Sequence, residues 1–343
     1  MKSCLFFLSY PWSVDDGGGK THAKQTIHAL QNLGVDTKPF DWTQENGEDF
    51  SHILVFGFSL HTPEIFRQLK RRYNSKIVVI PIFDRPQSRL TMKISHTMGL
   101  LFPLDNVAKR RKELLTIADK IMVNNTLEKH DFMHIFGIPK EKIIVNHLGL
   151  PLDLPDLYRE IQPALFQQFS GLTNYIFFPA ANVTERKNQL FLLCALKDTS
   201  FPLVLTGTEN IQPSLKKDFD RLIATRKNTF CYGRLERNML ISAYKGATAV
   251  VQPSRFETAG IVAMEAVYCG APTVVSDIPV FREYLGDAAI YLPFHPRQWK
   301  ETLHFLYEGR FPLPAKRSQE EFYEKHNWTT YAKNLIETFQ GIK

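Results

Sequence analysis

The chain has 343 residues, of which 44% are hydrophobic and 22% charged, and its net charge is +7. This length predicts about two domains, and the composition is typical of a folded globular protein, which excludes disordered and fibrous classes. No apolar run approaches the roughly 20 residues of a membrane-spanning helix. The first ten residues resemble the start of a signal peptide, but Pro11 and Trp12 stand where small residues of a cleavage site belong. We therefore interpret this segment as a buried strand.

The four cysteines, Cys4, Cys194, Cys231 and Cys269, lie far apart and form no C-x-x-C pair. Such spacing favours reduced thiols over zinc ligands or disulfides. We therefore expect a cytoplasmic protein.

The positive charge is concentrated in one region. Residues 67–112 carry a net charge of +10, and the rest of the chain carries −3. A local basic excess fits nucleic acid, anionic lipid, a phosphorylated substrate or an ordinary solvated helix face. Within it, residues 88–102 mix basic with large apolar side chains and K-R-R-K follows at 109–112, which suits both an anionic membrane surface and a helix packed on its own sheet. We predict no nucleic-acid partner, because no binding module is recognisable.

Short apolar runs rich in β-branched residues alternate with longer stretches of helical period, which predicts parallel βαβ units. Strands are expected at residues 3–9, 52–58, 76–83, 120–125 and 142–148, and again at 174–180, 201–207, 228–233, 247–253 and 271–277. The proline-spaced segment 150–163 between these groups is interpreted as a link between domains. The sequence thus predicts an α/β protein with two doubly wound domains and a cleft between them.

The first glycine-rich segment, D-D-G-G-G-K-T-H at 15–22, stands between an expected strand and an expected helix. Gly19, Lys20 and Thr21 match the end of a P-loop, but Val14 stands where that loop needs a glycine. A nucleoside triphosphatase is therefore disfavoured. A turn that contacts phosphate and a plain strand-to-helix turn both remain compatible with this segment.

The most informative pattern spans residues 253–277. A strand ends at Pro253, a loop carries Glu257, and a helix opens with Gly260 in its first turn. Backbone N–H groups at such a helix start favour an anion. Glu265 follows Glu257 by eight residues, a separation of about 12 Å if both are helical, which is too far for two carboxylates flanking one glycosidic bond. We expect the two glutamates to hold different parts of one extended ligand.

This segment resembles the E-x7-E signature of glycosyltransferase family 4. Members of that family have the GT-B fold, two Rossmann-like doubly wound domains facing each other across a cleft, and they transfer sugar from a nucleotide sugar with retention at the anomeric carbon. Further segments resemble the family in the same order, at residues 15–34, 142–150, 185–196, 230–254 and 326–339. The resemblance implies an acceptor-side domain at 1–155, a nucleotide-sugar domain at 156–327, and a last helix at about 328–343 that crosses back.

The resemblance also implies the roles of particular residues. Glu257 would contact hydroxyls of the donor sugar, and Glu265 the ribose hydroxyls. Arg186 and Lys187 would neutralise the departing diphosphate, as a divalent ion does in other transferases. The other implied donor contacts lie in the glycine loop, around the base, and at the helix start that faces the sugar and the distal phosphate. They are Gly18 and Gly19, then Tyr232, Gly233 and Arg234, then Ala259, Gly260 and Ile261.

The chain departs from the family at two places. Ala181 and Asn182 stand where the family commonly has a Gly-Arg pair, and no histidine follows the third expected strand. His61 and Asp84 are the candidates for binding sugar or acceptor hydroxyls, although a hydrogen-bonded loop role fits both.

The D-x-D pair Asp218 and Asp220 matches a metal signature of other transferases, but it falls in a charged amphipathic segment rather than at a strand end. We therefore predict no metal site, and no cofactor beyond the donor as co-substrate.

The predicted function is retaining, metal-independent transfer of a hexose from a UDP-glucose-like donor to a glycan or lipid-linked glycan acceptor. Such a reaction belongs to polysaccharide or glycoconjugate biosynthesis, at the inner face of the cell membrane if the basic apolar segment contacts lipid. Two alternatives are a nucleotide-sugar epimerase of the same fold and a catalytically silent sugar-nucleotide-binding scaffold.

Overall fold

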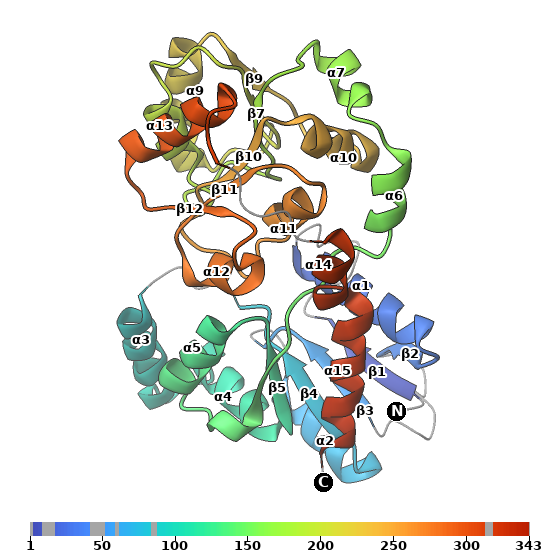
Figure 1. The fold of residues 1–343 in the computed structure, drawn as a ribbon. Coiled ribbons are helices and arrows are strands. Elements are labelled where there is room, and N and C mark those ends of the chain that lie inside the picture. The colour runs from blue at the N-terminus through green and yellow to red at the C-terminus, as the bar shows by residue number, and fades with distance from the viewer. Residues whose placement is uncertain are drawn as a thin grey trace. The chain divides into compact units, whose positions relative to one another are not determined.

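The computed structural model describes residues 3–8, 18–41, 52–58, 62–83, 88–312 and 318–342. The chain divides into two compact units (Figure 1), one formed by Met1–Pro151 with His326–Lys343 and the other by Leu152–Lys325. Each unit contains a six-stranded sheet. The sequence analysis placed the boundaries after residues 155 and 327. Within the described ranges, none of the helices is long and apolar enough to cross a membrane.

The sheet of the N-terminal unit has the order β2-β1-β3-β4-β5-β6, and its paired strands are parallel. Its inner strands are buried on both faces, as expected for a parallel sheet covered by helices. The strands are β1 (Ser3–Phe7), β2 (Asp36–Pro39), β3 (His52–Phe56), β4 (Lys76–Ile80), β5 (Lys120–Val123) and β6 (Ile143–Val145).

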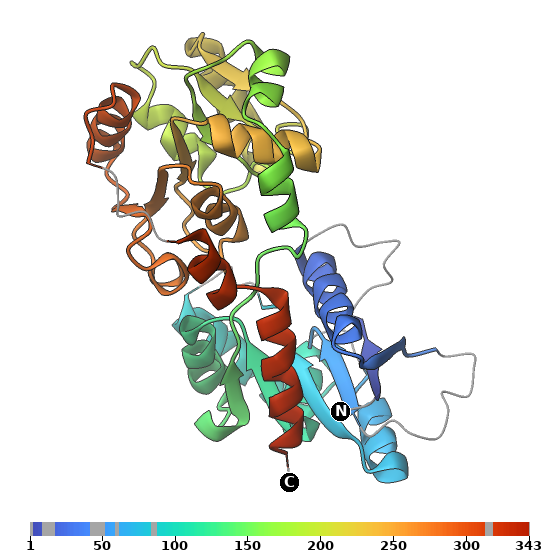
Figure 2. The same cartoon turned by 45° about the vertical axis from the view of Figure 1, so that its right-hand side comes forward.

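The helices of this unit form two layers. α1 (Gly18–Asn32) packs against α15 (Trp328–Gln340), so that the last helix of the chain lies beside the first (Figure 2). In the other layer, neighbouring helices pack in the order α2, α4, α3 and α5. Their bounds are α2 (Pro63–Tyr73), α3 (Arg89–Leu101), α4 (Val107–Ile117) and α5 (Thr126–Phe136).

Three helices of the second layer and α15 begin with a side-chain cap. Ser88 accepts a hydrogen bond from Thr91 N, Asn106 accepts bonds from two amides of α4, and Asn125 accepts one from Glu128 N. Such caps satisfy amides that have no partner inside the helix. Asn327 caps α15 in the same way. These polar residues therefore determine where the helices around the sheet begin.

The sheet of the C-terminal unit has the order β12-β11-β10-β7-β8-β9, and its paired strands are also parallel. Numbered within the unit, this is the 3-2-1-4-5-6 order of a dinucleotide-binding fold. The strands are β7 (Ile176–Phe178), β8 (Leu203–Leu205), β9 (Thr229–Cys231), β10 (Ala249–Gln252), β11 (Thr273–Ser276) and β12 (Ile290–Leu292).

Helices of the C-terminal unit pack in two groups. One group shares a hydrophobic core with alternate residues of β7, β8 and β10: α8 (Gln189–Ala195), α9 (Lys216–Thr225) and α13 (Pro296–Tyr307). In the other group α10 contacts α6, α7 and α11, and α11 contacts α12 and α14. Their bounds are α6 (Leu154–Glu160), α7 (Ala164–Ser170), α10 (Arg237–Gly246), α11 (Ile261–Tyr268), α12 (Pro279–Leu285) and α14 (Gln319–Lys325).

The ten predicted strands are all present, and the prediction of an α/β fold with two doubly wound domains is confirmed. The structure adds β2 and β12, each of which is one of the two edge strands of its sheet. Segment 150–163, interpreted as a link between domains, contains the helix α6. Pro155 lies in the first turn of α6, where its fixed φ and missing N–H are tolerated.

Candidate active site

The candidate site lies where the chain direction switches within the C-terminal sheet. β7 and β10 are neighbours, but the chain continues from β7 to β8 on one side and from β10 to β11 on the other. Open α/β sheets bind ligands beyond the carboxyl ends of strands at such a switch point. The loops that follow these two strands carry Arg186, Lys187 and Glu257. The structure therefore brings Arg186 and Lys187 into contact with Glu257, which lies about 70 positions further along the chain.

A buried carboxylate holds two cations at this point. Lys187 Nζ lies 2.7 Å from Glu257 Oε1, and Arg186 Nη1 lies 3.0 Å from Glu257 Oε2. Glu257 and Lys187 are only 4% and 8% exposed. Burial raises the pKa of Glu257, but the attraction of Lys187 and Arg186 outweighs it and holds the pKa below its usual value. One anion thus faces two cations, and the cluster keeps a positive charge.

The two loops are tied together by their backbone. Arg255 N donates to Arg186 O at 2.8 Å, and the Asn188 side chain donates to Pro253 O at 3.1 Å. Arg255 Nε in turn donates to Asn188 Oδ1 at 3.2 Å. Asn188 has a left-handed backbone with φ 62°, which asparagine tolerates better than most residues. These contacts fix Arg186 and Lys187 in place before any ligand binds.

Gly260 shapes the start of α11. It has φ 73° and ψ 42° and stands immediately before Ile261, the first residue of the helix. A Cβ atom here would meet Phe281 Cε1 at 2.5 Å, so both the backbone and the packing require glycine. Ala259 is buried beside it. Because amides in the first turn of a helix have no partner within the helix, this turn offers N–H donors next to Glu257.

Glu265 is also buried and paired, although with a different cation. Its Oε1 lies 2.6 Å from Arg237 Nη1, and Tyr244 OH donates to its Oε2 at 3.2 Å. Burial raises the pKa of Glu265 against the pull of Arg237. The sequence analysis did not single out Arg237. The signal was present in the spacing of Arg237 and Tyr244, which lie seven residues apart and therefore on one face of α10.

The residues implied for base binding lie elsewhere along the same edge. Tyr232, Gly233 and Arg234 follow β9, two strands away from β7, which is about 10 Å at the usual strand spacing. The Tyr232 ring packs on Phe169, with 5.4 Å between ring centroids. Arg234 N donates to the carboxylate of Glu209 at 2.9 Å. The structure thus places this group apart from the Glu257 cluster but at the same end of the sheet.

The remaining residues that the sequence proposes for the site all belong to the N-terminal part of the chain. Gly18 and Gly19 form the first turn of α1, and a Cβ atom at Gly18 would meet nothing within 4 Å. His61 and Asp84 lie outside the described residues.

The D-x-D pair lies on the exposed face of α9. Asp218 pairs with Arg221 at 2.9 Å, and Asp220 pairs with Lys216 at 2.6 Å. Among the described residues, no group of three or more His, Cys, Asp or Glu side chains is arranged to hold a metal ion.

Comparison with known proteins adds the following matches. Residues 162–324 match the family model of group 1 glycosyl transferases. The O-antigen chain mannosyltransferase RfbU of Salmonella typhimurium is 26% identical over 59% of this chain and 53% of its own length. An uncharacterized glycosyltransferase of Methanocaldococcus jannaschii is 24% identical over 71% of this chain and 65% of its own length. The chain thus spans between half and two thirds of these relatives.

Solved structures resemble the whole chain. Sucrose-phosphate synthase from Thermosynechococcus elongatus superposes with a TM-score of 0.72 at 16% identity, covering 99% of this chain and 98% of that one. HepE from Anabaena, solved in complex with UDP and glucose, gives a TM-score of 0.67 at 14% identity, covering 99% and 100%. The fold is therefore GT-B, and together with the family model these matches support a glycosyltransferase. Membership of family 4 and the E-x7-E assignment stay predictions.

Proposed function

We propose that this protein transfers a hexose from a nucleotide diphosphate sugar to an acceptor hydroxyl, and that Arg186 and Lys187 stabilise the departing diphosphate. The observation that carries the proposal is their position: two fixed cations at the switch point of a dinucleotide-type sheet, held by one buried carboxylate. Positive groups placed in advance where charge develops lower the barrier most, because they need no rearrangement during the reaction.

The two cations can bind an anion while they remain paired with Glu257. An ammonium group has three N–H donors and a guanidinium group has five. The contacts to Glu257 use one donor of each cation. The remaining donors are available to phosphate oxygens, and the first turn of α11 can add backbone amides. We propose that these groups act where a divalent ion acts in other transferases, so that the reaction needs no metal.

The two glutamates are proposed to bind donor hydroxyls, Glu257 those of the sugar and Glu265 those of the ribose. A carboxylate has about four acceptor sites, so each glutamate can keep its cation and still accept bonds from two neighbouring hydroxyls. The ion pairs hold the carboxylate oxygens in place and favour their ionised form. Retention at the anomeric carbon is proposed on the family resemblance alone.

The relatives suggest the chemical class of donor and acceptor. One similar structure is described with UDP-glucose, and similar sequences include O-antigen chain mannosyltransferases and D-inositol 3-phosphate glycosyltransferases. We propose a UDP-glucose-like donor and a glycan or lipid-linked glycan acceptor for this chain. A cytoplasmic site of action at the inner face of the membrane would bring such an acceptor within reach of the enzyme.

The proposal is tested by thermal unfolding against a panel of nucleotide sugars. A donor at 100 times its Kd stabilises the folded protein by about 2.7 kcal/mol, which corresponds to a rise in Tm of roughly 5–10 °C for a domain of this size. We expect this rise with one UDP-sugar in the wild type and in Lys216→Met, which changes an exposed lysine of α9. It should be lost in Lys187→Met. An equal rise in Lys187→Met would remove the proposed site.

Product analysis separates transfer from the two alternatives. A transferase releases free nucleotide diphosphate in step with glycosylated acceptor. An epimerase converts one nucleotide sugar into another without acceptor, and a silent binder shows the thermal shift but no turnover. The buried Glu257 cluster supports a ligand site under each of these interpretations, since two cations beside a buried carboxylate are costly to maintain unless they bind a ligand.

A further inference from the structure

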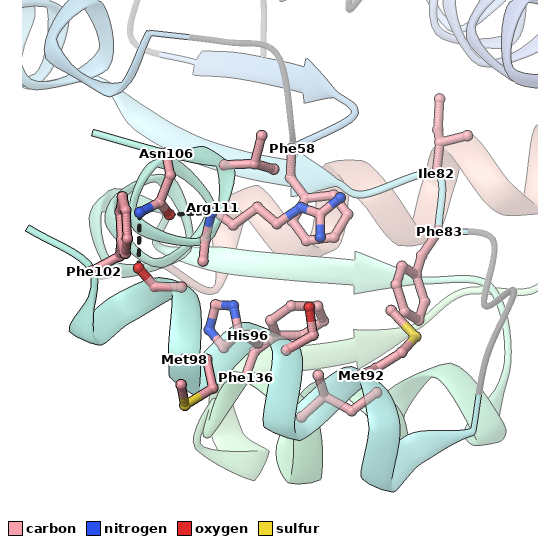
Figure 3. A pocket seen from close by; sticks show the side chains of 15 residues that line it. Phe58, Ile82, Phe83, Met92, His96, Met98, Phe102, Asn106, Arg111 and Phe136 are labelled. Carbon is pink, nitrogen blue, oxygen red and sulfur yellow. Dashed lines mark hydrogen bonds between the residues drawn. The ribbon is translucent and has the colours of Figure 1, made fainter. Parts of the chain in front are cut away.

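A cavity lies in the N-terminal unit beneath α3. Its volume is about 810 Å³, which is in the range of sites for drug-sized ligands. Side chains from α3, α4, the end of α5 and the loops after β3 and β4 line it (Figure 3). Most of the lining residues are apolar, including Phe83, Met92, Phe102 and Phe136. An apolar ligand, or the apolar part of one, fits such walls.

The cavity stands at the ligand-binding edge of its sheet. Phe58 follows the carboxyl end of β3, and Ile82 and Phe83 follow the carboxyl end of β4. This is the edge at which parallel sheets bind ligands. Ile82 has a positive φ of 44°, a conformation that a β-branched residue adopts only at a cost. Backbone strain of this kind is concentrated at functional sites.

Two nitrogen-bearing side chains enter the apolar wall. The Arg111 guanidinium lies over the Phe58 ring, 4.9 Å from its centroid (Figure 3). His96 is only 8% exposed, and its Nδ1 atom is buried and has no hydrogen-bond partner within the described ranges of the chain. Burial lowers the pKa of His96, and the positive charges of Arg111 and Lys112 lower it further, so the ring is neutral at pH 7. A buried polar atom without a partner is costly, and a ligand in the cavity would supply one.

The cavity opens onto an exposed apolar face. Leu90, Ile94 and Met98 recur every four residues along α3 and therefore form one stripe on its surface. They are exposed by 67%, 54% and 63%, and Leu101 continues the stripe at 75%. Met98 belongs to both the stripe and the cavity wall. The apolar stripe therefore adjoins the cavity wall along α3.

We propose that this cavity binds an anionic lipid, with the apolar chain among the aromatic and methionine side chains, the phosphate beside Arg111, and His96 Nδ1 hydrogen-bonded to the head group. The basic charge of residues 67–112 complements such a phosphate. The inference that this lipid is the acceptor's anchor rests on the proposed glycosyl transfer. Binding itself does not depend on that function.

The test uses dodecyl phosphate below its micelle concentration, titrated into the full-length protein by calorimetry without any nucleotide sugar. Inorganic phosphate and dodecanol separate the head group from the chain. We expect saturable binding of dodecyl phosphate, at least tenfold weaker binding of dodecanol, and none of inorganic phosphate. Arg111→Met removes the charge, and Ser95→Trp places a bulky ring at an exposed position of the cavity wall. Each should weaken binding at least tenfold.

The matched control is Lys112→Met, which removes an exposed positive charge next to Arg111 on the same helix. It should bind dodecyl phosphate within twofold of the wild type. Absence of binding, or equal loss in Lys112→Met and Arg111→Met, would overturn the proposal. So would unchanged binding in Ser95→Trp, whose fold is checked by its melting curve. The nucleotide-sugar shift that depends on Lys187 is measured on the same samples, so failure of the lipid site leaves the donor site independently tested.

Discussion

His22 in the N-terminal unit and two glutamates in the C-terminal unit are buried in opposite ways. In the C-terminal unit Glu257 and Glu265 are both 4% exposed, and each is paired with a cation. In the N-terminal unit His22 is 5% exposed and packs among aromatic rings, with Nε2 at 3.0 Å from Tyr331 OH. Burial lowers the pKa of His22 to about 3, so it is neutral in the folded protein. The two glutamates are buried beside a partner charge, and His22 is buried without its charge.

This difference distinguishes side chains that are suited to binding a charged ligand from a side chain that serves packing. Paired charges at the carboxyl edge of a sheet retain donors and acceptors for a charged ligand. The neutral His22 uses its hydrogen bond to join α1 to α15, and it sits against Phe56 of β3 and Trp328. Its contacts therefore stabilise the position of the last helix. We expect changes in the two groups to affect different measurements, activity for the first and acid stability for the second.

The largest expected effect is a loss of folding stability at acid pH. Between pH 6.5 and 3 the unfolded chain protonates His22 and the folded chain does not, so folding is progressively disfavoured as the pH falls. A shift of this size corresponds to a loss on the order of 4 kcal/mol, of which roughly half should be seen between pH 6.5 and 4.5. We expect urea unfolding, followed by tryptophan fluorescence, to show a shallower pH dependence in His22→Phe than in the wild type.

The control for His22 is His130→Phe, because His130 lies on the exposed surface of α5. It should retain the pH dependence of the wild type. If His22→Phe and His130→Phe lose stability equally as the pH falls, then His22 is not the group that titrates.

The next largest effect is on turnover. Lys187→Met removes a cation that is fixed against Glu257 and leaves the ion pair of that carboxylate with Arg186. Removing one preorganised donor to a developing charge costs about a hundredfold or more in rate. The rate of nucleotide diphosphate release measures this loss. Lys216→Met, on the exposed α9, should keep the wild-type rate, and a similar rate in both variants would contradict the assignment.

Arg237→Met tests the second pair and should act mainly on stability. The change leaves Glu265 buried with only Tyr244 as a partner. Losing one member of a buried pair costs several kcal/mol, but the Arg237 side chain is 30% exposed, so water can reach the site and we expect about 2 kcal/mol from urea unfolding. Adding Glu265→Gln should recover part of this loss. A double variant less stable than Arg237→Met would show that the pair is not the cause.

Eight of the ten predicted strands are inner strands of the two sheets, and parallel strands covered on both faces read as short apolar runs. Two edge strands, β2 and β12, were not predicted from the sequence. β2 reads D-T-K-P and β12 only I-Y-L. Each lies at an edge of its sheet and pairs on one side, so neither needs a long apolar run. α6 was not predicted because it is only seven residues long, which is too short for a helical period to show, and because a proline lies in its first turn.

The candidate site was only partly predictable. The segment around Glu257 and Glu265 shows a pattern in one stretch of chain, but the pairing of Glu265 with Arg237 joins residues 28 positions apart. A contact between residues so far apart along the chain leaves no periodic pattern in the sequence. The cavity beneath α3 is less predictable still. It depends on how α3, α4 and the ends of β3 and β4 pack together, and the sequence shows only that residues 88–102 are both basic and apolar.

The smallest expected effect returns to the N-terminal edge, where the structure offers apolar surface instead of paired charge. Ile94 is 54% exposed on α3 and does not line the cavity, so its side chain is free to enter a lipid surface. Ile94→Glu removes that contact and adds a negative charge, which should weaken binding to vesicles with 30% anionic lipid about tenfold. Sedimentation with such vesicles measures the effect. Thr225→Glu adds the same charge on α9 and should bind within twofold of the wild type. Equal weakening in both variants would point to net charge alone and would remove α3 as the membrane contact.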